Sequence, residues 1–353
     1  MAVRVMIMAG GTGGHVFPAL AVADYLRSAG HKVSWLGTKK GIEARVVPEA
    51  GIEIDWLSVS GLRGKGVLSL LLAPYMLLKA CFQASSIIRR RQPDVVLGLG
   101  GFASGPGGLM SWLHGKPLVI HEQNRVPGTT NRLLKGLAKR VLEAFPNSFN
   151  KSTKAIFTGN PVRKELLGGS VNEQRKNVNI LVVGGSLGAS ILNEVVPDAL
   201  QLLQDELSFN VIHQAGKTTV ERAKEKYSRA NVKADIQVFI DDMREVYQWA
   251  DMVICRAGAM TISEVAIMGL PSILVPLPHA IDDHQTKNAA YLADEGAAVL
   301  MPQSTFTPEA LSETLKALLS DKKKLSEMSS KARSLAKPDA TMLVANTCLE
   351  VAL

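Results

Sequence analysis

Cysteine is scarce in this chain. Its three cysteines, Cys81, Cys255 and Cys348, lie far apart and form no Cys-x-x-Cys pair or Cys/His spacing. That pattern argues against a disulfide framework and a zinc site, and it fits a reducing, cytoplasmic compartment. With 46% hydrophobic and 20% charged residues, the composition fits a globular protein and argues against a disordered or fibrous class.

A hydrophobic run long enough to span a bilayer is also lacking. The most apolar run, Val67 to Leu78, has about a dozen residues and contains Pro74, whereas a spanning helix needs roughly 20. Its flanks are basic, with Arg63, Lys65, Lys79 and Arg89 to Arg91. The run is therefore either a buried core helix or an apolar patch that lies on an anionic membrane. The N-terminus carries no charged region with a cleavage site, so we expect no signal peptide.

Acidic residues are fewer than basic ones, and the formal net charge is +8. A basic chain points to an anionic partner, which is nucleic acid, an acidic membrane face or a phosphorylated substrate. Charge alone does not choose among these three. The length of 353 residues predicts about two domains.

Two segments of similar design lie half a chain apart. Val5 to His15 and Ile180 to Ala189 each read as an apolar strand, a glycine turn and the start of a helix. Such a turn lets backbone N–H groups approach a phosphate, and the helix N-terminus adds partial positive charge. The pairing predicts two α/β domains whose parallel sheets face each other. We place the domains at 1–160 and 161–337, with a closing helix at 338–353 that is free to return to the first domain.

The alternation of apolar runs predicts the elements of each domain. Strands are expected at 3–9, 32–36, 53–57, 94–99 and 117–121, and then at 180–183, 210–213, 236–239, 252–255, 272–275 and 298–300. Helices are expected at 17–29, 43–49, 67–91 and 129–137, with a closing helical run over 308–353 that Pro338 breaks.

The first glycine loop, Gly10 to Gly14, lacks the spacing of a dinucleotide site. The strand that follows ends at Trp35 to Lys40 without the acidic residue that binds a nicotinamide cofactor's ribose, so NAD is disfavoured. His15 stands at the start of the helix, where the partial positive charge of a helix N-terminus favours the neutral form of a histidine. It is either a capping histidine or a general base for a substrate hydroxyl.

The second glycine loop, from Gly98 to Gly108, has six glycines in eleven positions. It serves either close packing or a backbone cradle for a diphosphate. His121 to Asn124 lie at the end of the next strand. We therefore expect them at the same edge of the sheet as the glycine loops, at the carboxyl ends of the strands, where α/β proteins bind ligands.

In the second half, Cys255 to Glu264 form another strand, glycine turn and helix start. Glu264 is either a favourable charge near the helix N-terminus or a carboxylate that accepts both hydroxyls of a ribose. His279 to Asn288 contain two histidines and two aspartates, but no matching cluster elsewhere supports a metal site. We interpret this segment as a loop that contacts sugar or phosphate.

The motifs of the chain come in a recognisable order. They are GGTGGH at Gly10, LGGFASGPGG at Leu99, HEQN at His121, GNPVR at Gly159, GGSLGA at Gly184, RAGAMTISE at Arg256 and DDHQTKN at Asp282. Together they cover nearly the whole chain and closely resemble the MurG family of bacterial cell-wall glycosyltransferases. One departure is Phe102, where the family often has tyrosine.

The resemblance implies a GT-B fold, with two Rossmann-like domains around a central cleft. It implies inverting transfer of GlcNAc from UDP-GlcNAc to the C4 hydroxyl of undecaprenyl-pyrophosphoryl-MurNAc-pentapeptide, in peptidoglycan synthesis. The expected setting is the cytoplasmic face of the cell membrane, with the chain bound peripherally to an anionic surface. The resemblance implies no cofactor, metal or nucleic acid; cell-wall synthesis and division proteins are candidate partners.

The family also suggests roles for particular residues. On the donor side, Ile240 contacts uracil through its backbone, Glu264 binds the ribose, and Ser186 with the helix start Ala259, Met260, Thr261, Ile262 and Ser263 holds the diphosphate. Arg163, Asn124 and Gln285 close around the donor, and Thr12, Gly13 and Gly14 face it from the first domain. The acceptor diphosphate is expected at Gly13, Gly14, Gly101, Ser104 and Gly105. His15 is the candidate base and Glu122 the second candidate.

Three other functions stay open on the sequence. A UDP-GlcNAc epimerase shares the donor site but has no need of an apolar basic patch. A nucleotide-linked dehydrogenase is disfavoured by the missing acid. A scaffold of the division machinery binds UDP without turnover.

Overall fold

The computed structural model describes residues 1–59, 72–168, 177–185, 187–278 and 280–353. Two compact units divide the chain. Unit 1 contains Met1–Arg163 and Lys337–Leu353, and unit 2 contains Lys164–Ala336. In the described ranges, no helix has both the length and the apolar character that crossing a bilayer requires.

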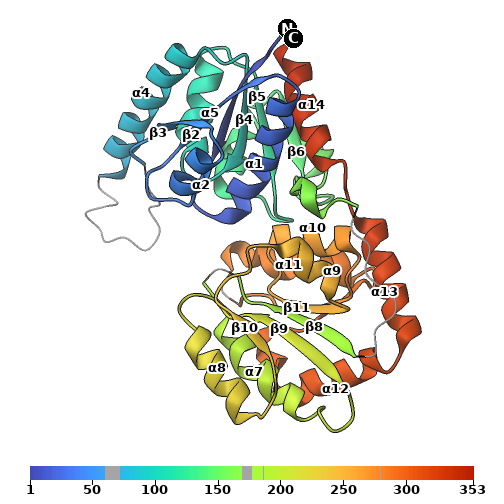
Figure 1. Cartoon of the computed structure of the whole chain (residues 1–353). Coiled ribbons are helices and arrows are strands. Elements are labelled where there is room, and N and C mark those ends of the chain that lie inside the picture. Colours follow the sequence, from blue (N-terminus) through green and yellow to red (C-terminus); the bar gives the residue numbers. More distant parts are fainter. Residues whose placement is uncertain (60–71, 169–176, 186, 279) are drawn as a thin grey trace. The chain divides into compact units, whose positions relative to one another are not determined.

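Unit 1 is built on a parallel sheet with the strand order β3-β2-β1-β4-β5-β6-β7 (Figure 1). The strands are β1 (Arg4–Ala9), β2 (Lys32–Gly37), β3 (Glu53–Trp56), β4 (Val95–Gly100), β5 (Leu118–Glu122), β6 (Arg140–Glu143) and β7 (Ile156–Phe157). The helices are α1 (Gly13–Ser28), α2 (Glu43–Glu49), α4 (Ala73–Arg91), α5 (Ser104–Leu113), α6 (Thr129–Leu134) and α14 (Ala340–Ala352), with the 3-10 turn η1 (Lys151–Thr153).

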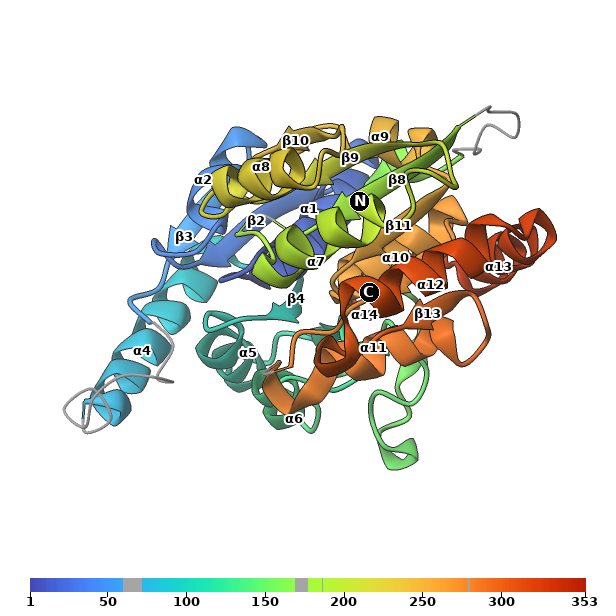
Figure 2. The ribbon, with the colours of Figure 1, turned by 90° about the horizontal axis from the view of Figure 1, so that it is seen from below.

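The first strand shows why this sheet is buried on both faces. Ile7 faces the core formed with α1 and α14, whereas Met6 and Met8 face the core formed with α4 and α5. Alternate side chains of a strand point to opposite faces, so an unbroken apolar run suits a sheet covered by helices on both sides. The ribbon views show α4 at the margin of the unit (Figures 1 and 2).

Unit 2 repeats this design with the strand order β10-β9-β8-β11-β12-β13. Its strands are β8 (Val178–Val183), β9 (Phe209–Gln214), β10 (Asp235–Gln237), β11 (Met252–Cys255), β12 (Ser272–Leu274) and β13 (Ala298–Leu300). Its helices are α7 (Ser190–Gln201), α8 (Val220–Arg229), α9 (Met243–Trp249), α10 (Ala259–Met268), α11 (His284–Ala293), α12 (Pro308–Leu319) and α13 (Lys322–Leu335), and its 3-10 turns are η2 (Lys164–Leu166), η3 (Ile281–Asp283) and η4 (Gln303–Thr305).

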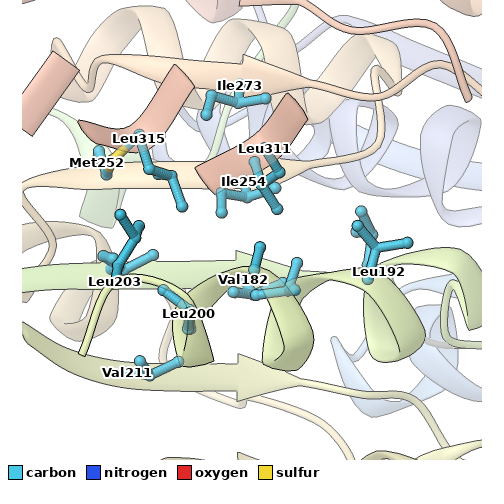
Figure 3. Packing of buried hydrophobic residues seen from close by; sticks show 14 of the residues in the cluster. Val182, Leu192, Leu200, Leu203, Val211, Met252, Ile254, Ile273, Leu311 and Leu315 are labelled. Atoms are coloured by element: carbon cyan, nitrogen blue, oxygen red, sulfur yellow. The ribbon is translucent and has the colours of Figure 1, made fainter. Parts of the chain in front are cut away.

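Leucines from two helices fill the core of unit 2 against its central strands. Figure 3 shows Leu192 and Leu200 of α7 and Leu311 of α12 packed on Val182 and Ile254. The branched side chains fill the space between the helices and β8 and β11, and their removal from water stabilises the unit.

Both sheets reverse their strand order at one point. In unit 1 this point lies between β1 and β4, and in unit 2 between β8 and β11. Ligands of open α/β sheets bind outside the carboxyl ends of the strands at such a switch point. Each glycine loop highlighted in the sequence follows one of these four strands.

Most predicted elements are confirmed, and the differences have local causes. The strands β6 and β7 are additional. Helix α1 begins at Gly13 rather than at residue 17, because glycines are tolerated in a first turn that packing stabilises. The predicted helix 67–91 is α4 from Ala73 onward, with Pro74 in its first turn, and residues 67–71 lie outside the described ranges. The break near Pro338 is confirmed between α13 and α14.

Candidate active site

The loop between β1 and α1 closes around the side chain of Glu43, from α2. Gly11 has a φ of 93°, and its N–H donates to Glu43 Oε2 at 2.9 Å. Thr38 donates its N–H and its hydroxyl to Oε1 at 3.0 and 2.7 Å. Glu43 is fully buried, so it fixes the conformation of the loop that leads into α1. From the sequence, this residue is expected only to begin a helix.

The loop between β4 and α5 touches the first glycine loop. A Cβ atom on Gly101, whose φ is 83°, would lie 2.3 Å from Gly10 O. Ser104 is buried, and its Oγ bonds to Met8 O at 2.9 Å and Gly100 O at 2.7 Å. Because this hydroxyl is engaged inside the protein, the groups of this loop suited to a phosphate are backbone N–H groups at the start of α5.

Replacing Gly101 with alanine is expected to destabilise the protein by about 1–3 kcal/mol, because the methyl group collides with the backbone of Gly10. Denaturant unfolding measures the change. Gly30→Ala is the matched control, since Gly30 has the same φ of 83° and nothing lies within 4 Å of its Cβ position. Equal losses in the two variants would mean that φ strain alone, and not contact between the loops, makes glycine necessary.

Two glycines of the segment 98–108 serve close packing, which is one of the two alternatives that the sequence left open. Gly107 and Gly108 lie within α5, where added Cβ atoms would stand 2.3 Å from Met8 Sδ and 2.7 Å from Leu134 Cδ1. The helix therefore approaches the sheet and α6 more closely than any larger residue allows.

Glu122, the second candidate base, ends β5 and is almost fully buried. Its Oε1 accepts the N–H of Asn124 at 3.0 Å. Its Oε2 accepts the N–H of Gly128 and Nδ2 of Asn131, both at 2.9 Å. These bonds tie the carboxyl group to the loop after β5, so we consider His15 the stronger candidate for the base.

His15 is half-buried in the first turn of α1 and meets residues from two distant motifs. Its Nδ1 lies 2.7 Å from Gln123 Oε1. Gln123 Nε2 lies 2.9 Å from His121 Nδ1, and His121 Nε2 lies 2.9 Å from Gly159 O. Asn160 Nδ2 also donates to Gln123 O at 3.1 Å. The GGTGGH, HEQN and GNPVR motifs thus form one hydrogen-bonded cluster.

The remaining site residues of unit 1 lie near the start of α1. Thr12 is its N-cap residue, and Gly13 and Gly14 begin the helix, where N–H groups have no partner within the helix. Arg163 places its guanidinium 5.5 Å from the centre of the Phe17 ring on the same helix. The structure thereby groups these residues with His15.

In unit 2, helix α10 presents its N-terminus after β11. Ala259 and Ile262 are buried, and Ser263 Oγ donates to Ala259 O at 3.0 Å. Their side chains are thus used within the protein, so the backbone at the helix start is the part suited to a diphosphate. One turn further, Glu264 accepts a hydrogen bond from the buried Tyr247 hydroxyl at 3.1 Å.

Two side chains shape the loop that follows β12. Gln285 Oε1 accepts the N–H of Leu277 at 3.0 Å. Arg256 donates to Val275 O and Pro276 O at 3.1 and 3.0 Å, and burial lowers the pKa of its guanidinium. Arg256 is a site residue without a predicted role, although its place in the RAGAMTISE motif was a signal.

Two other residues, Ile240 and Ser186, are predicted to contact the donor. Ile240, expected to contact uracil, follows β10 and buries its side chain, which leaves its backbone for such a contact. Ser186 lies outside the described residues. Across the described ranges, no three His, Cys, Asp or Glu side chains converge as metal ligands would.

Two Rossmann-like units, each with glycine-lined helix starts at the switch point of a parallel sheet, are typical of the GT-B fold of glycosyltransferases. The model of the glycosyltransferase family 28 N-terminal domain matches residues 5–143, and that of its C-terminal domain matches residues 179–344. The chain belongs to glycosyltransferase family 28 and, within it, to the MurG family. The predicted family and fold are confirmed.

Relatives of known name span the full chain. A protein of Methylococcus capsulatus is 56% identical over 353 residues, which cover 100% of this chain and 99% of that protein. One of Pseudomonas fluorescens strain SBW25 is 54% identical over 354 residues, with the same coverage. Both are named UDP-N-acetylglucosamine–N-acetylmuramyl-(pentapeptide) pyrophosphoryl-undecaprenol N-acetylglucosamine transferase.

The crystal structure of Acinetobacter baumannii MurG, 44% identical, matches with a TM-score of 0.84 over 99% of each chain. A UDP-N-acetylglucosamine 2-epimerase structure, 15% identical with a TM-score of 0.68 over 97% of this chain and 94% of that one, shares the fold alone.

Proposed function

We propose that this chain transfers GlcNAc from UDP-GlcNAc to the C4 hydroxyl of undecaprenyl-pyrophosphoryl-MurNAc-pentapeptide, with inversion, in peptidoglycan synthesis. The full-length relatives that carry the name of this transferase support the reaction. The structural observation that carries it is His15, held at the start of α1 beside the two glycine loops of the unit 1 switch point. A base and a phosphate cradle are thereby combined at one sheet edge.

An inverting transfer needs a base for the attacking hydroxyl and stabilisation of the departing diphosphate. His15 takes the C4 proton in this account. The N–H groups at the start of α10, with the partial positive charge of that helix, stabilise the negative charge that develops on UDP. No step requires a metal ion.

The donor occupies unit 2 in this proposal. Glu264 accepts the ribose hydroxyls, Ile240 meets uracil through its backbone, and Ser186 with residues 259–263 holds the diphosphate. Tyr247 supports the ribose contact, because its hydroxyl fixes one oxygen of Glu264. The family resemblance adds Gln285 of unit 2 to the donor contacts, together with Asn124, Arg163 and Thr12 to Gly14 of unit 1.

The acceptor diphosphate lies over the glycine loops of unit 1, at Gly13, Gly14, Gly101, Ser104 and Gly105. The closeness of Gly101 to Gly10 supports this, since it joins two helix N-termini into one region of N–H donors.

Release of UDP from UDP-GlcNAc tests the activity. We expect release only when the lipid-linked muramyl acceptor is present. Formation of ManNAc or UDP-ManNAc without acceptor would indicate an epimerase instead. Tight UDP binding without turnover would indicate a scaffold.

Membrane association is supported by exposed apolar side chains on α4, α5 and α6. Phe82 is 76% exposed and Trp112 is 50% exposed. The exposed side chains on these helices also include Tyr75, Leu77, Leu78, Leu109, Leu113 and Leu133. None of the three helices contains an acidic residue, and Lys79 and Arg132 are exposed on them. A peripheral site on an anionic, cytoplasmic membrane face suits this chemistry.

Two of the basic residues that flank the apolar run are paired with acids. Arg90 and Arg91 pair with Asp55 of β3, and Arg91 also pairs with Glu53. Their charges are largely balanced, because α4 packs beside the edge of the sheet that carries these acids. Arg63, Lys65 and residues 67–71 lie outside the described ranges. Contacts with cell-wall synthesis and division proteins stay a prediction.

The double variant Phe82→Ser with Trp112→Ser is expected to bind anionic vesicles at least 10-fold more weakly, because each large apolar side chain contributes about 1.5–3 kcal/mol when it leaves water. Vesicle co-sedimentation measures this. Leu202→Ser, on a half-exposed leucine of unit 2, is the control and is expected to bind normally. Unchanged sedimentation of the double variant would contradict the membrane assignment.

A further inference from the structure

A chain of hydrogen bonds runs from the backbone of Gly159 to the ring of His15. It passes from Gly159 O to His121 Nε2 at 2.9 Å, from His121 Nδ1 to Gln123 Nε2 at 2.9 Å, and from Gln123 Oε1 to His15 Nδ1 at 2.7 Å. All of these residues belong to unit 1. The function proposed above assigns no role to Gln123 or His121.

In the hydrogen bond between His121 and Gly159, the donor can only be the histidine. A carbonyl oxygen accepts hydrogen bonds and never donates, so His121 Nε2 carries the proton that it shares with Gly159 O. His121 is fully buried, and this desolvation lowers its pKa from 6.5 to about 4. The ring is therefore neutral near pH 7, and its Nδ1 is an acceptor.

The second link fixes the amide of Gln123. The nitrogen Nε2 lies 2.9 Å from His121 Nδ1 and also 2.9 Å from His121 O. Both partners accept, so the amide nitrogen and not the oxygen must face them. The oxygen Oε1 then points to His15 Nδ1, and this nitrogen must be the donor.

We propose that Gln123 and His121 are positioning residues that hold His15 as the Nδ1–H tautomer and so leave the lone pair on Nε2. This inference rests on the proposed function. In the reaction, the C4 hydroxyl proton passes to His15 Nε2, and the oxygen forms its bond to C1 of GlcNAc. The bond between C1 and the phosphate oxygen breaks, and its electron pair leaves with UDP.

The surroundings of the ring agree with this role. Within the described residues, only Gln123 forms a hydrogen bond with the His15 ring, and that bond uses Nδ1. On one side the ring lies against Gly100, where a Cβ would stand 3.1 Å from Cε1. A larger residue at this position would displace the ring, so glycine allows the contact that keeps Nδ1 on Gln123.

Charged residues near this cluster are the same in every variant below. Glu43 accepts the N–H of Gly11, and the Arg163 guanidinium lies 5.5 Å from the centre of the Phe17 ring on α1. Glu122 accepts the N–H of Asn124, the residue after Gln123. Their effect on protonation of the His15 ring is the same in a variant and in the wild type, so it cancels when the two are compared under the same conditions.

Imidazole ¹⁵N NMR of the histidine-labelled full-length protein tests the tautomer directly. Above its pKa, we expect His15 in the wild type to show a protonated Nδ1 and an unprotonated Nε2. A proton on Nε2 would overturn the proposal, whatever the activity. Because this readout needs no substrate, it separates failure of the tautomer from failure of the proposed transferase.

The variant Gln123→Met tests the catalytic consequence. It removes both polar atoms of the side chain, so the Nδ1–H form is no longer selected, and kcat is expected to fall about 10-fold or more with UDP affinity unchanged. The ¹⁵N spectrum of the same variant should show that the proton of His15 is no longer confined to Nδ1, a change that a purely structural role would not produce. Wild-type kcat, or a His15 tautomer unchanged from the wild type, would overturn the proposal.

Discussion

His15→Ala is expected to lower kcat by about 10²- to 10⁴-fold, the usual contribution of general base catalysis. UDP affinity should stay close to that of the wild type, because the contacts to uracil, ribose and the donor diphosphate are assigned to unit 2 and this side chain lies in unit 1. Steady-state kinetics with the lipid-linked acceptor and calorimetric titration with UDP measure the two quantities separately.

The matched control is His31→Ala. His31 also belongs to unit 1, but its Nδ1 accepts the N–H of Val3, at the opposite edge of the sheet. This variant should keep the wild-type kcat. An unchanged kcat in His15→Ala would remove His15 from the base role, whereas equal losses in both variants would point to general destabilisation.

Glu264→Ala is expected to weaken UDP-GlcNAc binding roughly 10- to 100-fold, because hydrogen bonds to a charged group contribute about 1.5–3 kcal/mol. The loss should appear in KM more than in kcat, since the ribose contact is the same in the ground state and the transition state. Tyr247→Phe removes only the hydroxyl that fixes Glu264, so its effect should have the same sign and be several-fold.

The control for these variants is Glu295→Ala, which removes an exposed carboxylate from the same unit. Its KM for UDP-GlcNAc should equal that of the wild type. If Glu264→Ala bound UDP as tightly as the control, the carboxylate would be a helix-dipole partner and not a ribose ligand.

The fold could be predicted where apolar runs are continuous. The strands β1, β8 and β11 are buried on both faces, and such runs are the clearest signal of a parallel sheet. The strands β6 and β7 were missed because they are short and lie at one side of the sheet, where the pattern is weak. Strand β7 has only two residues, and β6 begins at the exposed Arg140.

The site could be predicted only in part. Glycine loops and helix starts are local patterns, and their sequence spacing places them at the sheet edges. The cluster around His15 depends instead on tertiary contacts, since Gln123 lies 108 positions further along the chain. Glu43 was missed for the same reason, because an acid at the start of a short helix is ordinarily a favourable charge on the dipole.

The glycines of the segment 98–108 show that the role of a glycine could not be predicted from the sequence. Sequence alone assigned them to one loop, but the structure assigns Gly107 and Gly108 to the close packing of α5. A glycine that admits a ligand and a glycine that admits a neighbouring helix look identical in a sequence. Only the atoms beside each Cβ position distinguish them.

The linkage of the product tests the central claim most directly. After reaction with UDP-GlcNAc and the lipid-linked muramyl acceptor, NMR of the isolated disaccharide reports which oxygen carries the new sugar and the configuration of its anomeric carbon. The account predicts a β-linked GlcNAc on O4 of the muramyl residue. An α-linked product, or UDP with free GlcNAc and an unmodified acceptor, would contradict it.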